Sequence, residues 1–216
     1  LPFRKAWRTL WAIRSLRRVF YALPFLSASL IGLAALLSLF WEEVYGLSPA
    51  ERGVLESASE AFQLVGIAVG AVVVQRALTK DPSHVVKLLA GAGFVAGGAI
   101  AAMALSPVFL GSVVARVVFA ILAVALIPGI YAVGSLVLPA RCRALGFSAA
   151  GIFALPGILF LPVAGAISDA HGLRAGMLVL IPVYLLGSVV LASSGLFVND
   201  DIETNRRAAK AAASRP

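Results

Sequence analysis

The chain has 216 residues, of which 61% are hydrophobic and only 13% charged, and its formal net charge is +8. A water-soluble domain must cover its surface with polar groups, so this composition excludes an ordinary soluble globular protein. Its basic residues flank apolar segments, where they orient a chain in a bilayer, and we therefore expect no nucleic-acid partner.

Six apolar segments run through the sequence and predict an all-α membrane protein. Each is long enough to cross a bilayer, because a helix rises about 1.5 Å per residue and the hydrocarbon core is about 30 Å thick. The six predicted spans are residues 19–40, 53–75, 84–105, 109–138, 145–167 and 175–197. The transmembrane domain is thus predicted to cover residues 19–197.

Lysine and arginine fall in alternate gaps between these spans. The segments 1–18, 76–87, 138–144 and 198–216 hold 6, 3, 2 and 4 basic residues, which is 15 in total, whereas the intervening gaps hold only Arg52 and Arg174. Cytoplasmic loops carry the excess of basic residues in membrane proteins. We expect a multi-pass protein of the plasma (inner) membrane with both termini in the cytoplasm.

Two polar segments flank the spans. Residues 1–18 mix six basic residues with Trp7, Trp11 and other apolar residues, which predicts an amphipathic helix on the cytoplasmic headgroups. A docking surface for a partner is the alternative interpretation. Residues 198–216 are polar and rich in alanine, and we interpret them as a cytoplasmic linker or a frayed helix.

The second span carries most of the ionisable groups. Ser48 and Glu51 form a capping-box pattern that predicts the start of this helix on the outer side. Glu56, Glu60 and Gln63 follow at positions i, i+4 and i+7, and therefore share one helix face. Glu60 lies about 6 Å deeper than Glu56, where a carboxylate must be protonated, paired or hydrated. We interpret these residues as candidates for proton coupling or cation binding, against the alternative of acids that reach the outer water.

The fourth span contains Arg116, which stays charged and requires an anion, a carbonyl cluster or water. Its depth makes Glu60 the expected partner, with an anionic substrate as the alternative. Tyr131, further along the same span, is a candidate cavity residue.

Proline and glycine predict bends in two of the spans. They occur as Pro128-Gly129 in the fourth span and as Pro156-Gly157 with Pro162 in the fifth. Proline removes a backbone donor and bends a helix, as happens around the central sites of carriers, although both residues are also frequent in ordinary spans.

The third and sixth spans lack internal charges. We therefore expect them to lie outside, facing lipid, with the other four spans around a polar centre. The small-residue pairs Gly66/Gly70 and Gly93/Gly97 predict close helix contacts.

No pattern of catalytic or metal-binding residues is found in the sequence. The two histidines, His84 and His171, fall in gaps on opposite sides of the membrane, and the single Cys142 excludes an internal disulfide. We expect neither an enzyme nor a cofactor.

A ten-residue stretch after the fifth span resembles the loop motif of the major facilitator superfamily, Gly-x3-Asp-x-x-Gly-x-Arg. The matching residues are Gly165, Asp169, Gly172 and Arg174. The stretch lies on the predicted outer side, whereas the family's strongest copy is cytoplasmic. The copy expected after the second span is reduced to Ala71-x3-Gln75-Arg76-x3-Lys80, and Gly157-x3-Leu161-Pro162-x2-Gly165 is a degraded relative of the antiporter motif.

The resemblance covers residues 15–197 and is closest to the carboxyl-terminal half of such a transporter. It implies two inverted three-helix repeats, with the first and fourth helices lining a cavity, the second and fifth meeting another six-helix half, and the third and sixth facing lipid. That second half would come from a longer chain, a partner or a second copy. The resemblance implies secondary transport of a small molecule by alternating access. The alternative is a non-transporting membrane anchor that holds a soluble partner.

Overall fold

The computed structural model describes residues 2–125 and 127–213, and no strand occurs among them. In chain order the elements are α1 (Phe3–Ala12), α2 (Arg14–Tyr45), α3 (Pro49–Lys80), α4 (Pro82–Leu105), α5 (Phe109–Ala125), α6 (Ile127–Val137), the 3-10 helix η1 (Ala140–Cys142), α7 (Arg143–Ala154), the 3-10 helix η2 (Leu155–Phe160), α8 (Leu161–His171), α9 (Leu173–Ser194) and α10 (Val198–Ala213). Leu126 lies outside the described residues.

The described helices confirm the prediction of a multi-pass membrane protein. Six segments are long and apolar enough to cross a membrane: α2, α3, α4, α5–α6, η1–α8 and α9. α2, α3 and span five extend beyond their predicted spans at both ends, whereas α9 ends at Ser194, before the predicted end at residue 197. α2 ends where Gly46 adopts a left-handed conformation at φ 68°. The predicted capping box is also present, because Ser48 and Glu51 exchange hydrogen bonds at the start of α3.

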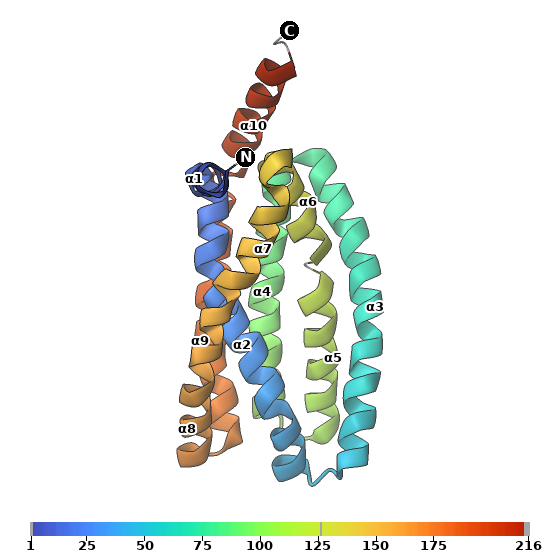
Figure 1. Ribbon diagram of the computed structural model, residues 1–216. Helices are drawn as coiled ribbons and strands as arrows, with labels where there is room; N and C mark the ends of the chain where they lie inside the picture. Colours follow the sequence, from blue (N-terminus) through green and yellow to red (C-terminus); the bar gives the residue numbers. More distant parts are fainter. Residues whose placement is uncertain (1, 126, 214–216) are drawn as a thin grey trace.

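The six spans form an elongated bundle in which some spans lie on the flanks and others lie between them. Figure 1 shows α3 along one flank and α8 along the other, with α2, α4, α5 and α9 between them. Glycine, which has no side chain, allows the helices to approach closely at the predicted pairs. A Cβ on Gly66 or Gly70 would collide with the α5 backbone, and one on Gly93 would collide with Ser188 of α9.

The third and sixth spans, α4 and α9, bury one face inside the bundle and expose apolar residues such as Phe94 and Val189 on another. Half of the most apolar stretch of α4 is buried inside the bundle, against 11% for the fifth span. α4 and α9 pack on each other between α5 and α2. A helix that is apolar all round can bury its surface against other apolar helices as well as against lipid, so composition alone does not decide between the two.

Span five is composed of shorter helices, whereas in span four α5 and α6 lie on either side of Leu126, which is outside the described residues. In span four, Pro128 and Gly129 lie in the first turn of α6. In span five, the α-helix gives way to η2 at Pro156 and Gly157, and Pro162 occupies the first turn of α8. The interruption predicted in span five is therefore present. It brings Gly157 against the backbone of α2 at Ala28.

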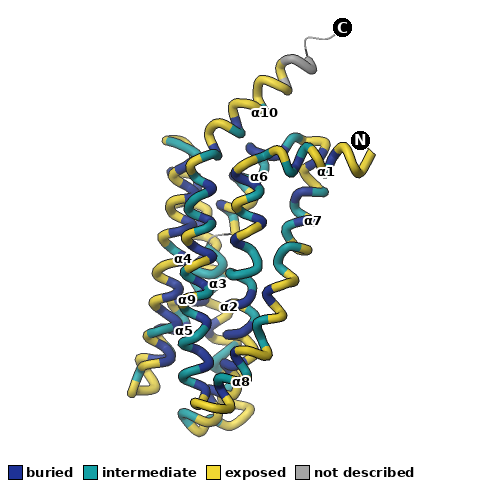
Figure 2. The backbone as a smooth tube through the Cα atoms, turned by 90° about the vertical axis from the view of Figure 1, so that its left-hand side faces the viewer, coloured by how far each residue is buried: buried dark blue, intermediate teal, exposed yellow. Residues whose placement is uncertain are grey.

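The two terminal helices lie at the same end of the bundle. α1 projects sideways and α10 continues away from the spans (Figure 2). Of the two interpretations of the carboxyl tail, the linker is wrong and the segment is helical, and α10 is anchored at its base. Val198 and Ile202 are buried there, and the carboxylate of Asp201 accepts hydrogen bonds from the backbone N–H and hydroxyl of Ser15 at 2.7 and 2.6 Å.

A second polar contact joins α10 to the turn between α3 and α4. The amide of Asn199 donates to Asp81, whose carboxylate also accepts the backbone N–H of Ser83. These hydrogen bonds hold the pKa of Asp81 below its usual value, and the bond from the backbone N–H of Ser83 has the largest effect.

Candidate functional site

A charged cluster joins three spans at the end of the bundle opposite the terminal helices. The guanidinium of Arg116, on α5, donates to one carboxylate oxygen of Glu56, on α3, at 2.6 Å from Nη2 and 3.2 Å from Nε. The indole N–H of Trp41, on α2, donates to the other oxygen at 2.8 Å. Because Arg116 and Trp41 are buried, this carboxylate is held by fixed donors.

The structure corrects the expected pairing of Arg116 with Glu60. Counting residues gives depth in the membrane but not the direction in which each side chain points. Glu56 is one helical turn nearer the predicted outer boundary, and the long side chain of Arg116 reaches it there. The sequence did not identify Trp41 as a hydrogen-bond donor of this cluster. A tryptophan near a span end is typical of the membrane interface and carries no further sequence signal.

Glu60 lies one turn further along α3 and is exposed, as is Ser57, while Gln63 is half-buried. None of these three side chains makes a hydrogen bond or ion pair within the described part of the chain. Apolar residues surround them on the same helix, with Leu64 71% exposed and Phe62 46% exposed. The flank of α3 therefore combines a carboxylate with a broad apolar surface.

A second ion pair closes the same end of the bundle between α2 and α3. One guanidinium nitrogen of Arg52, Nη1, is 2.6 Å from the carboxylate of Glu42 and also donates to the hydroxyl and carbonyl of Ser38. The Nε of Arg52 is buried and has no hydrogen-bond partner among the described residues. Arg52 and Glu42 were not singled out from the sequence, although they are opposite charges that flank a tight turn.

The residues of the loop motif do not gather into one site. Gly172 takes a φ of 86° and separates α8 from α9, while Asp169 is exposed and Gly165 half-buried. Arg174 instead donates to the backbone carbonyls of Ala104 and, at 3.0 Å, Ser106, at the carboxyl end of α4. The arginine satisfies carbonyls that have no partner within the helix.

The remaining motif candidates lie at the opposite end. Gln75 and Arg76 are exposed on the last turns of α3, far along the helix from Glu56. Arg76 lies in a groove with Lys80, His84 and Lys87.

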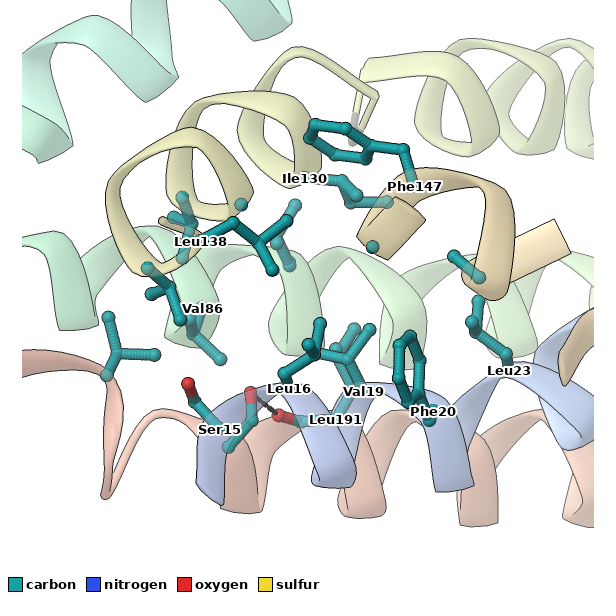
Figure 3. Close-up of a pocket in the computed structure, with 18 of the residues that line it drawn as sticks. Ser15, Leu16, Val19, Phe20, Leu23, Val86, Ile130, Leu138, Phe147 and Leu191 are labelled. Atoms are coloured by element: carbon teal, nitrogen blue, oxygen red, sulfur yellow. Dashed lines mark hydrogen bonds between the residues drawn. The ribbon is translucent and has the colours of Figure 1, made fainter. Parts of the chain in front are cut away.

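An apolar cavity of about 110 Å³ lies among α2, α4, α6, α7 and α9, on the side of the terminal helices. Figure 3 shows Ile130 and Phe147 on one side of it, opposite Leu16, Val19 and Phe20 of α2. Tyr131 is exposed and packs on Phe147, with ring centroids 5.0 Å apart, but it does not line this cavity. The hydroxyls of the lining Ser15 and Ser194 already donate to Asp201 and to the backbone carbonyl of Leu191, so neither has a hydrogen left to donate to a polar solute.

Comparisons with models of protein families, with curated proteins and with solved structures find no match for this chain.

Proposed function

We propose that the chain is one six-helix half of a secondary transporter that moves a small solute across the cytoplasmic membrane by alternating access. A second half, from a longer chain, a partner or another copy, covers the flank of α3. Both termini face the cytoplasm, as the distribution of basic residues requires.

The observation that carries this proposal is the exposed carboxylate of Glu60 on a helix of membrane-spanning length. A charged side chain facing lipid at that depth is costly, so it must face protein or water. The exposed apolar residues around it are suited to contact with another protein, and the carboxylate to contact with water and protons. A water-accessible path between two six-helix halves provides the protein contact for the apolar residues and the water contact for the carboxylate.

The order of packing supports two related three-helix units. The first span, α2, packs on the sixth, α9, and the fourth span, α5, packs in the same way on the third, α4. Likewise the second span, α3, packs on the fourth, and the fifth span packs on the first. Exchanging the first three spans with the last three leaves this set of neighbours unchanged. An inverted repeat, as in the major facilitator family, produces such a pattern.

In this proposal the Arg116–Glu56–Trp41 cluster holds the outer ends of three spans together, and Glu60 carries the coupled proton. Opening toward the outside would separate α3 from α2 near Trp41. The geometry thus gives the two glutamates of one helix face different roles, one in closure and one in coupling.

Proteoliposomes that contain the native protein with both six-helix halves, together with a trapped pH-sensitive dye, test the proposal. With an imposed proton gradient, we expect members of a panel of small organic solutes to change the rate of proton entry. Glu60→Gln should lower that solute-dependent flux at least tenfold while leaving membrane insertion and unfolding temperature unchanged. Glu43→Gln, an exposed glutamate at the end of α2, is the matched control and should retain full flux.

Full flux in the Glu60→Gln variant would remove the coupling role. Complex formation with a soluble protein that depends on residues 1–18 or on α10, without any solute flux, would favour the membrane-anchor alternative.

A further inference from the structure

A basic groove lies between the end of α3 and the start of α4, outside the cluster described above. It has a volume of about 560 Å³. Its basic residues are Arg76 and Lys80 of α3 and His84 and Lys87 of α4, and all four are exposed. Its remaining lining is apolar: Val73, Ala77, Leu88, Gly91 and Ala92.

Helical periodicity produces this groove. On α3, residues 73, 76, 77 and 80 follow the spacing i, i+3, i+4, i+7, and residues 84, 87, 88 and 91 repeat it on α4. Each helix therefore turns one stripe toward the groove. On α4 the basic residues lie nearest the turn at Asp81 and the apolar ones further from it, whereas on α3 Ala77 lies between Arg76 and Lys80, with Val73 furthest from the turn.

The positive charge of the groove is not neutralised from within the protein. Among the described residues, Arg76, Lys80 and Lys87 take part in no ion pair. The acid nearest the turn, Asp81, is 3.9 Å from Nδ1 of His84 and already accepts hydrogen bonds from Ser83 and Asn199. An anionic ligand would therefore meet unpaired cations.

We propose that this groove binds an anionic phospholipid, with the phosphate at Arg76, Lys80 and Lys87 and an acyl chain along Leu88, Gly91 and Ala92. Basic pockets between spanning helices on the cytoplasmic side are suited to such headgroups. A free phosphate would use only the basic half of the groove, whereas a lipid fits both the charged and the apolar halves. The inference does not depend on transport.

Native mass spectrometry of the full chain, titrated with phosphatidylglycerol or phosphatidylcholine in a neutral detergent, tests the charged half. The double variant Lys80→Gln/Lys87→Gln should weaken phosphatidylglycerol binding about 25-fold, since each basic residue near an anionic surface contributes about fivefold. Arg4→Gln/Lys5→Gln removes the same charge from the exposed face of α1 and should leave this affinity within twofold.

A steric pair of variants tests the apolar half without altering charge. A Cβ on either Gly91 or Gly98, both exposed on α4, would meet no atom within 4 Å, so a side chain can start at both positions without a clash. Gly91→Phe fills the floor of the groove and should weaken phosphatidylglycerol binding at least fivefold, whereas Gly98→Phe should not change it.

Three results would overturn the proposal. They are equal affinity for phosphatidylcholine, equal loss in the two charge variants, and displacement of the lipid by glycerol phosphate at the lipid's own concentration. Displacement by glycerol phosphate would show that the groove binds only the headgroup and makes no contact with the acyl chain.

Discussion

At the scale of single residues, the paired charges of Arg116 and Glu56 are the feature that most constrains this protein. Removing one partner from a buried ion pair leaves the other charge without compensation, at a cost of about 3–5 kcal/mol. The side chain of Glu56 is 30% exposed, and solvent will offset part of that cost. Even the remainder is large against the total stability of a folded domain.

We expect Glu56→Gln to destabilise the chain by about 2–3 kcal/mol, because Arg116 keeps its charge and loses its anion. Denaturant unfolding in lipid–detergent micelles, followed by circular dichroism, measures this loss. Glu60→Gln, on the same helix face, should change stability by less than about 0.5 kcal/mol, since the exposed Glu60 has no partner in the described chain. Equal losses in the two variants would contradict the assignment of Arg116 to Glu56.

The sequence predicted that Arg116 needs an anion but not which one it finds. Arg116 lies on the fourth predicted span, and both glutamates lie on one face of the second, so either satisfies the electrostatic requirement. The choice depends on how α3 is rotated against α5, and that rotation is set by Gly66 and Gly70 packing on the α5 backbone. Counting residues along one helix does not predict how that helix is rotated against its neighbour.

At the scale of elements, close packing of α3 on α5 depends on the absence of side chains. A Cβ on Gly70 would collide with the carbonyl group of Ala125, and backbone atoms move less readily than side chains. The equivalent approach of η2 to α2 at Gly157 shows that both flanks of the bundle rely on glycine.

Gly70→Val should therefore destabilise the chain by about 1–3 kcal/mol through overpacking. The matched control is Gly53→Val on the same helix, where a Cβ would meet no atom within 4 Å. Thermal unfolding compares the two variants. An unfolding temperature of Gly70→Val equal to that of the control would show that α3 and α5 are further apart than described here.

The amphipathic character of residues 197–202 could have revealed the docking of α10. Val198 and Ile202 are spaced i, i+4, and both are buried against the spans. The interpretation of this segment as a linker or a frayed helix gave weight to its overall polarity instead. Its bond to Ser15 was beyond sequence reasoning, because the two residues are 186 positions apart.

Asp201→Ala should loosen α10, since a charged hydrogen bond to the start of α2 contributes about 1.5–3 kcal/mol. Amide hydrogen exchange within α10 should accelerate at least tenfold, with little change in α4. The neighbouring Asp200 is exposed, and Asp200→Ala serves as the control. Unchanged exchange in Asp201→Ala would mean that the apolar contacts of Val198 and Ile202 hold α10 without this bond.

At the scale of the whole molecule, an even number of crossings places α1 and α10 together at one end of the bundle (Figure 1). Hydropathy and charge sufficed to predict this much, because both reflect the bilayer rather than the details of packing. The relative positions of the spans required the structure, as the burial of α4 shows.

Cysteine labelling in cells measures the orientation. In a Cys142→Ala background, a membrane-impermeant maleimide should label His171→Cys in intact cells and Lys5→Cys only after permeabilisation. Both positions are exposed in the structure, and the native Cys142 is buried. The reverse pattern would invert the topology and would place the basic groove outside the cell.

The hydrogen bonds from Arg174 to the last carbonyls of α4 have a mechanical consequence. They fasten the beginning of α9 to the end of α4, and the guanidinium also lies 5.8 Å from the ring centroid of Phe40 on α2. Two neighbouring central helices, already packed along their length, are thereby tied at their tips. In any large rearrangement α4 and α9 would then move together as one rigid unit. Bending would occur instead in span five, where the helix is interrupted at Pro156 and Gly157.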